Sequence, residues 1–351
     1  MKAKADIRKR DWKMGLVAIW GLITILTYLS PLLNPLHLAA GIVAIVAYPV
    51  VLGINFLLLI WLLYRANYRT ALVIVFVMAV GWPLHSSLMG FNSTSQQPEQ
   101  SDLKIATFNI NYGWNIQTED RHNTASLAAY LKNHKKPDIL CLQEYITDMD
   151  EWLLEALPYT HVINNRPYRT AIFTNHEVLD RGYFNFDNYE NSVVWADIDI
   201  PEKGVVRVYN LHLQTNQVTD DSRKIRDRGL DFDEETAKTL WGILRNYQRA
   251  ASIRVEQVTT VLEHAKNSPY PVFIAGDIND VPISYIYRKL SYGRKDTFTE
   301  RGRGLGVTYK GPLPFLRIDL ILADPEFKVI RHDIIEGDFS DHKPVVAWLR
   351  W

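Results

Sequence analysis

No Asp, Glu, Lys or Arg occurs between Met14 and Tyr64. This uncharged run is far longer than the roughly 20 apolar residues that one bilayer crossing needs, so the sequence predicts more than one crossing. Four residues interrupt the run: Pro31, Asn34, Pro35 and His37. We therefore expect transmembrane helices at about 14–33 and 38–63, and a third at about 70–89. Apolar residues lie all round these segments, whereas the core helices of a soluble domain usually have a polar face.

The positive charges around these segments predict their orientation. The N-terminal arm carries six Lys and Arg residues, and Arg65 and Arg69 follow the second segment, whereas the loop between the first two segments carries none. Loops rich in Lys and Arg face the cytoplasm. Three crossings then place the chain after Met89 outside the cytoplasm, in a periplasm or an extracellular space.

The charge balance differs between the two parts of the chain. The whole chain has 39 basic and 39 acidic side chains and a formal net charge of zero, which argues against a strongly basic nucleic-acid-binding protein. Residues 1–101 hold eight basic groups against three acids, a balance of +5, so the other 31 basic and 36 acidic groups give −5. The single cysteine excludes a disulfide framework within the chain and a Cys-based zinc site.

Composition also predicts the domain boundaries. A stretch rich in Ser, Gln and Asn follows the apolar segments, which is typical of a linker. We expect a membrane anchor at 1–90, a linker at 91–102 and a second domain at 103–351.

From Leu103 onward, short apolar and β-branched runs recur. Nine runs predict strands: "LKIATFNIN" at 103–111, "DILCLQE" at 138–144, "TAIFTN" at 170–175, "SVVWADIDI" at 192–200, "VVRVYNLHL" at 205–213, "PVFIAGDI" at 271–278, "IDLILAD" at 318–324, "FKVIRHDII" at 327–335 and "PVVAWLR" at 344–350. Between them, the sequence predicts helices at about 124–134, 148–157 and 234–267. Many strands with few crossover helices indicate an α/β domain of stacked sheets with helices outside.

Polar residues are concentrated where these strands end. Ten of them are candidates for a functional site: Asn109, Asn111, Glu144, His212, Asp277, Asn279, Asp280, Asp319, Asp341 and His342. Carboxylate and carboxamide oxygens are the ligands that Mg²⁺ prefers, and it holds substrate phosphates as well. Histidines transfer protons near neutral pH, and a carboxylate bonded to one ring nitrogen fixes which nitrogen faces the substrate. Asn111 and Asp280 also suit turns after strands.

The ordered motifs "TFN", "LQE", "NLHL", "GDIND", "RIDLI" and "SDH" resemble those of the endonuclease/exonuclease/phosphatase superfamily. This superfamily includes pancreatic-type deoxyribonucleases, abasic-site endonucleases, neutral sphingomyelinases and inositol polyphosphate phosphatases. The resemblance covers about 103–351 and implies a four-layer α/β sandwich of two mixed sheets, here preceded by three transmembrane helices. It also implies a metal-dependent phosphodiesterase, phosphatase or endonuclease, a hydrolase acting on ester bonds.

The resemblance further implies a metal site. Glu144 resembles the principal metal-binding carboxylate of the family, with Asn109 beside it as a ligand or an orienting group. Asp341 resembles an acid that orients a histidine or shares the metal. Mg²⁺ is the implied cofactor, with Mn²⁺ as the alternative.

Five residues have implied catalytic roles: His212, Asp277, Asn279, Asp319 and His342. Asp277 and Asn279 resemble the pair that positions the attacking water and the phosphate. His342 resembles the histidine that contacts the scissile phosphate. Asp319 resembles an acid that orients a histidine or shares the metal. His212 matches a second histidine of the deoxyribonuclease and sphingomyelinase branches, and which histidine is the general acid stays open. Two further cations, Arg169 and Arg254, are candidates for binding the anionic substrate, with a structural role as the alternative.

Three functional hypotheses follow. The first is a membrane-anchored Mg²⁺-dependent hydrolase in which water attacks phosphorus in line, acting on a phospholipid headgroup or another small phosphoester. The second is an extracytoplasmic nuclease of the same chemistry, and the third is an inactive anchored module that binds partners. Complete motifs argue against the third. The membrane tether, and the lack of a basic cluster of five or more residues in the second domain, favour the first over the second.

Overall fold

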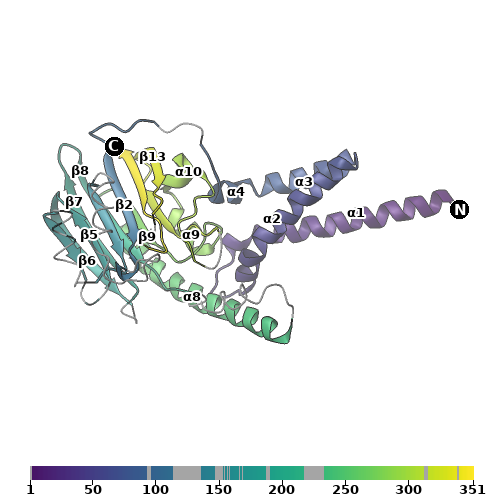
Figure 1. Cartoon of the computed structure of the whole chain (residues 1–351), viewed down its shortest axis with the longest axis horizontal. Helices are drawn as coiled ribbons and strands as arrows, with labels where there is room; N and C mark the ends of the chain where they lie inside the picture. Colours follow the sequence, from purple (N-terminus) through teal and green to yellow (C-terminus); the bar gives the residue numbers. More distant parts are fainter. Residues whose placement is uncertain are drawn as a thin grey trace.

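The structure is a computed structural model of the chain. It describes residues 2–92, 96–113, 136–146, 159–165, 169–186, 190–216, 233–311, 315–337 and 340–351, together with four single residues between 153 and 167. Side chains are described from residue 15 onward. Figure 1 shows a sandwich of two sheets from which the N-terminal helices project on one side, with the N-terminus at the far tip and the C-terminus on the sandwich.

One six-stranded sheet has the order β13-β14-β2-β3-β5-β4. Its strands are β2 (Leu103–Asn109), β3 (Ile139–Gln143), β4 (His161–Asn164), β5 (Thr170–Thr174), β13 (Lys328–Ile334) and β14 (Val345–Arg350). The central pair β2 and β3 is parallel, and the other pairs are antiparallel. Every residue of β2 and β3 is buried, which explains why both read as continuous apolar runs.

The second six-stranded sheet has the order β10-β12-β9-β8-β7-β6. Its strands are β6 (Glu177–Asn185), β7 (Ser192–Ile200), β8 (Gly204–His212), β9 (Val272–Asp277), β10 (Lys295–Asp296) and β12 (Asp319–Ala323). Here β8 and β9 are parallel. A separate two-stranded sheet pairs β1 (Gly90–Phe91) with β11 (Arg303–Gly304).

All nine runs that the sequence predicts as strands are strands, and the α/β class with two mixed sheets is confirmed. The sequence missed the edge strands β4 and β6 and the two-residue strands β1, β10 and β11. In β6 most side chains are exposed, and Asp180, Arg181 and Gly182 interrupt any apolar alternation. The helix expected at 124–134 lies outside the described residues, as does most of the one expected at 148–157.

The main core lies between the two sheets. Its members are side chains that point from one sheet toward the other, such as Ile105, Ile139, Val194, Val208, Phe273 and Ala347. A second core lies between β7–β9 and the helices α8 (Glu234–Lys266) and α9 (Tyr285–Ser291). The predicted helix at 234–267 is thus confirmed, and Val255, Val258 and Val261 pack on the sheet. A short helix, α10 (Thr297–Arg301), follows β10.

Gly276 allows β9 to approach β8 closely. Its φ is +135°, and a Cβ atom there would lie 2.1 Å from the backbone oxygen of Leu211. Any other residue would push the strands apart. The glycine therefore fixes the position of Asp277, the last residue of β9, beside His212, its partner in register on β8.

The three predicted transmembrane helices are the main correction to the sequence analysis. The helices present are α1 (Lys2–Thr27), α2 (Ala40–Tyr64), α3 (Tyr68–Val80) and α4 (Trp82–Leu88), with a 3-10 turn at Ser30–Leu32. Within the described residues, α2 alone is long and apolar enough to cross a membrane. The apolar part of α1 is the shorter Gly15–Thr27, and the third segment bends by 64° between α3 and α4, so it counts only as a broken span. Length and apolar content therefore support one crossing, or two with the bent pair, and not three.

The N-terminal helices pack against the sandwich. The hydroxyl of Ser30 donates to the backbone oxygen of Ile283 at 2.9 Å, and that of Ser87 donates to the oxygen of Pro282 at 3.2 Å. The backbone oxygen of Ser87 accepts a hydrogen bond from Arg317 at 2.9 Å. Since Pro282 and Ile283 follow β9 and Arg317 precedes β12, α4 is docked at the end of the sandwich where these strands carry Asp277 and Asp319.

The described part of the expected linker is bound to the opposite end of the sandwich. Arg350 donates to both carboxylate oxygens of Asp102 at 2.7 and 2.9 Å and pairs with Glu99 at 2.8 Å. Lys203 donates to the backbone oxygen of Ser101. The chain thus leaves α4 at one end of the sandwich and enters β2 at the other (Figure 1).

Candidate active site

Asn109 links two acidic residues at the carboxyl ends of the central strands. Its amide nitrogen donates to Oε1 of Glu144 and to Oδ2 of Asp277, both at 3.1 Å. Its amide oxygen accepts the backbone N–H of Asn111 at 3.0 Å, which identifies the nitrogen and closes the turn after β2. Asn109 itself is fully buried. One side chain therefore joins β2, β3 and β9, and with them the two sheets.

Glu144 follows β3 in an unusual backbone conformation. Its φ is +52°, in the left-handed region that residues other than glycine and asparagine seldom adopt. Such conformations persist where the surroundings enforce them, and they cluster at functional sites. The carboxyl group retains 17% exposure, and burial raises its pKa, with a further increase from the negative charge of Asp341. Glu144 is thus a largely buried acid that keeps part of its carboxyl group accessible.

His212, at the end of β8, has one ring nitrogen with a fixed partner and one without. Its Nδ1 donates to the backbone oxygen of Glu190 at 2.6 Å. Its Nε2 has no hydrogen-bond partner among the described residues and lies 3.6 Å from Glu144 Oε1 and 4.0 Å from Asp277 Oδ2. Burial lowers the pKa of His212, although the charge of Asp277 opposes this. The neutral ring therefore directs the lone pair of Nε2 toward the acids.

His342 is held by Asp319. Its Nδ1 lies 2.9 and 3.1 Å from the two carboxylate oxygens of Asp319, so the ring donates to that carboxylate. Burial alone would lower the pKa of His342, but the charges of Asp319 and Asp277 outweigh it, and the pKa lies well above its usual value. The second nitrogen, Nε2, lies 3.7 Å from Asp277 Oδ2. His342 is thus a cation whose Nε2–H points into the same space as His212.

Asp277 lies at the centre of this group. Its Oδ1 accepts the backbone N–H of Asn279 at 2.8 Å, and its Oδ2 accepts from Asn109. Burial raises the pKa of Asp277, the nearby charge of Asp319 raises it further, and that of His342 opposes both. Asp319 is opposite Asp277 in the antiparallel register of β9 and β12. Strand pairing therefore places these two carboxylates side by side.

The loops after β8 and β9 are bonded to each other. The side chain of Asn279, whose φ is +52°, donates to the backbone oxygen of Leu213 at 2.9 Å. Asn216 donates in return to the backbone oxygen of Asn279 at 3.1 Å. Asn279 therefore fixes the two loops that follow His212 and Asp277.

Arg254 is not where the substrate-binding prediction puts it. Its side chain is fully buried in α8, so in this structure it cannot contact a substrate. It donates to the backbone oxygen of Gln214 and to Asn216, both at 2.8 Å, and pairs with Asp280 at 3.1 Å. The hydroxyl of Tyr247 also donates to Asp280 at 2.6 Å. Arg254 and Asp280 therefore hold the loops after β8 and β9 from the interior of the protein. Both residues have a structural role, which was the alternative to substrate binding for Arg254 and to a place in the functional site for Asp280.

Arg169 and Asp341 lie at the edge of the group. The guanidinium of Arg169 stacks on the ring of Tyr112, 4.5 Å from its centroid, and lies 3.9 Å from Glu190. About a third of its side chain is exposed. Asp341 is half-buried and accepts from the hydroxyl of Ser340 at 3.3 Å. Arg169 thus keeps part of its guanidinium exposed beside the site, and Asp341 lies close enough to Glu144 to influence its ionisation.

The carboxylates outnumber the cations in this buried space. Among the described residues, Glu144, Asp277, Asp319 and Asp341 are opposed by His342 and, at the edge, by Arg169, which also pairs with Glu190. Buried carboxylates need a compensating charge, and oxygen donors suit a divalent cation. The tightest group of possible ligand atoms in the described chain is Asp277, Asp319 and His342, within 4.8 Å of one another. Asp319 and His342 already bond each other, so this group is poorly suited to a cation. Glu144 and the acids beside it fit a cation better.

Sequence reasoning missed several residues that support the site. Gln143 donates to Asn210 at 2.6 Å, and Asn210 donates across the core to the backbone oxygens of Leu142 and Ala171. The hydroxyl of Ser340 donates to the backbone oxygen of Asn109 at 2.7 Å. Polar residues inside "LQE", "NLHL" and "SDH" were the available signal.

The comparisons with known proteins agree with this geometry. A model of the Endonuclease/Exonuclease/phosphatase family matches residues 106–342. No curated protein matches the chain. Among solved structures, an endonuclease/exonuclease/phosphatase family protein from Bacteroides thetaiotaomicron is 19% identical, with 72% of this chain and 98% of that chain covered and a TM-score of 0.53.

Two other solved structures have similar scores. A mannosyl-6-phosphatase from Bacteroides thetaiotaomicron is 19% identical, with 71% of this chain and all of that chain covered and a TM-score of 0.53. D. rerio TDP2, complexed with a single strand DNA product, is 18% identical, with 72% of this chain and all of that chain covered and a TM-score of 0.51. At these identities the likeness shows a shared fold.

Proposed function

Because the chain belongs to the endonuclease/exonuclease/phosphatase family and is therefore a hydrolase acting on ester bonds, we propose that it is a membrane-anchored, Mg²⁺-dependent phosphoester hydrolase. In this proposal water attacks phosphorus in line. The substrate is a phospholipid headgroup or another small phosphoester, and the domain acts outside the cytoplasm.

One observation carries the proposal. Nε2 of His212 lies 4.0 Å from Asp277 Oδ2, and Nε2 of His342 lies 3.7 Å from the same oxygen. Both distances are somewhat longer than a hydrogen bond. A water to one side of these atoms can form hydrogen bonds to a ring nitrogen and to the acid at once. A water held there can lose its proton to Asp277, whose pKa burial raises toward the working range of a base.

The other residues act on the phosphoryl group. His342, charged and oriented by Asp319, donates from Nε2 to a phosphoryl oxygen and stabilises the charge that develops there. His212 is placed to move a proton through Nε2 on the other side of the same space. Asn279 holds the loops that carry His212 and Asp277, and the exposed part of Arg169 receives the anionic group at the rim.

Glu144, with Asp341 close by, would hold the metal ion, and Asn109, whose amide nitrogen donates to Glu144, would orient that carboxylate. The two carboxylates fit the ion because their hard oxygen donors lack sufficient positive charge in the protein itself. When bound, Mg²⁺ offsets charge on phosphoryl and leaving oxygens. The same donors accept Mn²⁺ as the alternative.

Membrane anchoring rests on the surface of the N-terminal helices. In α1–α3 many large apolar side chains are exposed, for example Leu22, Val50, Phe56, Leu57, Leu72 and Phe76. Such a surface is unstable in water and fits lipid. The junction of α2 and α3, where α2 ends before Arg65 and α3 begins at Tyr68, lies at the end away from the sandwich (Figure 1). A basic junction on the cytoplasmic side would leave the hydrolase domain on the opposite side.

A nuclease of the same chemistry is the second candidate. The fold is shared with a phosphatase acting on a phosphosugar and with a protein bound to single strand DNA product. The −5 balance of residues 102–351 favours the small-phosphoester hypothesis, since duplex binding rests on several Lys or Arg contacts to phosphates.

A substrate panel tests this proposal. The full-length chain in detergent micelles is assayed with phospholipids, mannose 6-phosphate, inositol phosphates, RNA and plasmid DNA, with Mg²⁺ and with a chelator. We expect Mg²⁺-dependent hydrolysis of a lipid or small phosphoester, abolished in His342→Ala. Cleavage of nucleic acid alone would favour the nuclease hypothesis, and no hydrolysis of any substrate would contradict both.

A further inference from the structure

An apolar stripe on α8 extends beyond the protein that covers it. Residues spaced by three or four form the stripe: Leu240, Leu244, Tyr247, Ala251, Val255, Val258 and Leu262. Its last three members pack on the second sheet or against that core. Its middle three pack against the N-terminal helices, in the cluster that contains Tyr28 and Ile42. Leu240, the first member, is 40% exposed.

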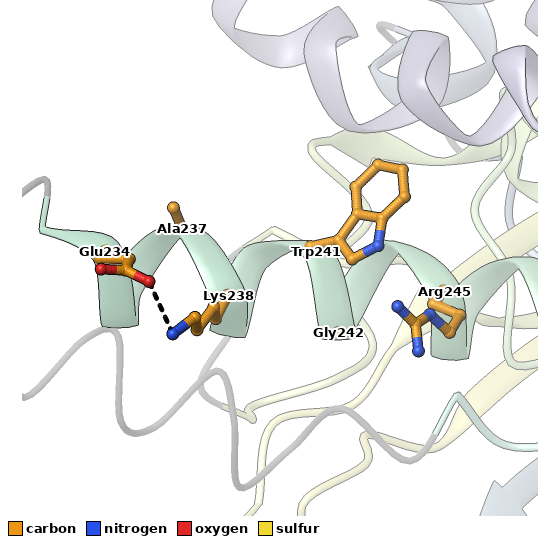
Figure 2. Close-up of a pocket in the computed structure, with 6 residues that line it drawn as sticks. All are labelled: Glu234, Ala237, Lys238, Trp241, Gly242 and Arg245. Carbon is orange, nitrogen blue, oxygen red and sulfur yellow. Dashed lines mark ion pairs between the residues drawn. The ribbon is translucent and has the colours of Figure 1, made fainter.

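Trp241 lies at the edge of this uncovered turn. Its side chain is 63% exposed, far more than is usual for tryptophan. Lys238 and Arg245 lie one turn to either side of it, and at 100° per residue both fall on the flank away from the apolar stripe. Figure 2 shows the indole extended from the helix and Lys238 paired with Glu234, at 2.7 Å. Trp241, Lys238, Arg245 and Glu234 line a shallow hollow of about 480 Å³.

The adjacent surface is apolar as well. Gln248 and Ser252 of α8 both donate to the backbone oxygen of Pro35, in the turn between α1 and α2. In the same turn, Leu36 is 44% exposed and Leu38 is 50% exposed. The start of α8 therefore emerges next to the end of the N-terminal helices that faces the sandwich, as Figure 1 also shows.

We propose that the first turns of α8, centred on Leu240 and Trp241, bind the phospholipid surface at the level of the lipid headgroups. An apolar stripe, a tryptophan at its edge and flanking basic side chains are the pattern of a helix that lies in the membrane interface. Tryptophan occupies that depth because its ring is apolar and its N–H is polar. Arg245 would extend to lipid phosphates, and so would Lys238 in exchange for its exposed ion pair with Glu234. The proposal rests on membrane insertion of α2, which is part of the proposed function.

This contact fixes the face of the hydrolase domain that meets the bilayer. Arg254, which holds the loops after His212 and Asp277, lies 13 residues along α8 from Trp241, or about 20 Å. A lipid-bound start of α8 would place the active-site loops near the membrane surface. The opposite end of the sandwich, with Asp102 and Arg350, would point away from the membrane.

Site-directed labelling tests the inference in the full-length chain. Cys141 is fully buried, and burial raises the pKa of its thiol, so an introduced cysteine is the reactive one. Trp241→Cys is labelled with the environment-sensitive dye NBD and reconstituted in phosphatidylcholine vesicles that carry a doxyl quencher at carbon 5 or carbon 12 of the acyl chain. Leu240→Cys is labelled in parallel, in case the first variant does not fold.

Two labelled controls show how a label behaves inside the membrane and away from it. Ile54→Cys is near the middle of α2 and 42% exposed, and Tyr183→Cys is on the edge strand β6 and 56% exposed. We expect the label at 241 or 240 to be quenched more by the carbon-5 doxyl than by the carbon-12 doxyl. At 54 we expect the reverse order, and at 183 no quenching.

The outcomes separate the two proposals. Quenching at 54 without quenching at 240 and 241 would overturn the interfacial contact and leave the anchor intact. A blue-shifted but unquenched label at 241 would do the same, because it would mean that protein and not lipid covers this turn. No quenching at 54 would refute the anchor itself, and the inference with it.

Discussion

Nδ1 of His342 lies 2.9 Å from Oδ2 of Asp319, and this pair determines the charge at the active site. The carboxylate fixes the orientation of the ring and, with Asp277, keeps it protonated. His212 has no such partner, because its Nδ1 donates to a backbone oxygen and burial lowers its pKa. The structure thus holds one charged and one neutral imidazole on either side of Asp277.

Asp319→Asn should reduce kcat strongly. The amide keeps the size of the side chain but removes the charge that raises the pKa of His342, so the ring becomes neutral at lower pH. Loss of one acid–base group typically costs about 10² to 10⁴ in rate. The measurement is kcat against pH for a phosphoester substrate. Asp333→Asn, the same change at a partly exposed residue that pairs with Arg331, should retain the wild-type rate, and equal rates for both variants would refute the role of the pair.

Arg254→Ala should destabilise the domain. It leaves Asp280 buried without its cation, which typically costs about 3–5 kcal/mol. For a domain of this size, that corresponds to a decrease of ~10 °C in the thermal midpoint. Differential scanning fluorimetry in detergent measures it, with Arg288→Ala on the exposed side of α9 as control. A midpoint within 2 °C, roughly the effect of a surface substitution, would show that the buried pair does not hold the loops.

His332 should make stability depend on pH. It is buried beside Thr297, and burial lowers its pKa from 6.5 to about 4 despite the opposing charge of Asp296. Because the folded state takes up this proton less readily than the unfolded state, the contribution is complete above pH 6.5 and is lost as the pH falls toward 4. At pH 5 the loss is about 2 kcal/mol.

The check on His332 is the thermal midpoint between pH 7.5 and pH 5. Wild type should lose more stability over this range than His332→Gln, which has no titrating ring at this position. Parallel pH profiles for the two proteins would contradict the assignment.

Mg²⁺ binding should stabilise the folded protein. A ligand that binds only the folded state raises stability by about 2.7 kcal/mol at 100 times its Kd. Wild type should therefore show a higher thermal midpoint in Mg²⁺ than in chelator, and Glu144→Gln should show little difference. An equal Mg²⁺ shift in Glu144→Gln would place the ion elsewhere.

The fold was largely predictable because its central strands are buried on both faces. Runs such as 103–111 and 271–278 are apolar without alternation, and turn or polar residues end each of them. Exposed edge strands such as β6 lack that pattern. The number of spans was overestimated because apolar content does not reveal a bend, and the chain turns by 64° near Gly81.

The site was predictable as a set of residues and not as a set of contacts. Glu144, His212 and His342 occur in recognisable motifs, but the bond from Asn109 to Asp277 joins residues 168 positions apart. Arg254 shows the limit most clearly. Whether an arginine on a helix faces solvent or two loops depends on how the helix packs, and its neighbours in the sequence do not encode that.

The central claim is that a metal held at Glu144 supports phosphoester hydrolysis. The most direct test is release of 4-nitrophenol from 4-nitrophenyl phosphate and from its bis-ester by the full-length chain, before and after removal of divalent cations. The account predicts that wild type loses activity in chelator and regains it with Mg²⁺, and that Glu144→Gln is inactive in both conditions although it folds. Release by wild type that is insensitive to chelator, or equal turnover by Glu144→Gln, would contradict it.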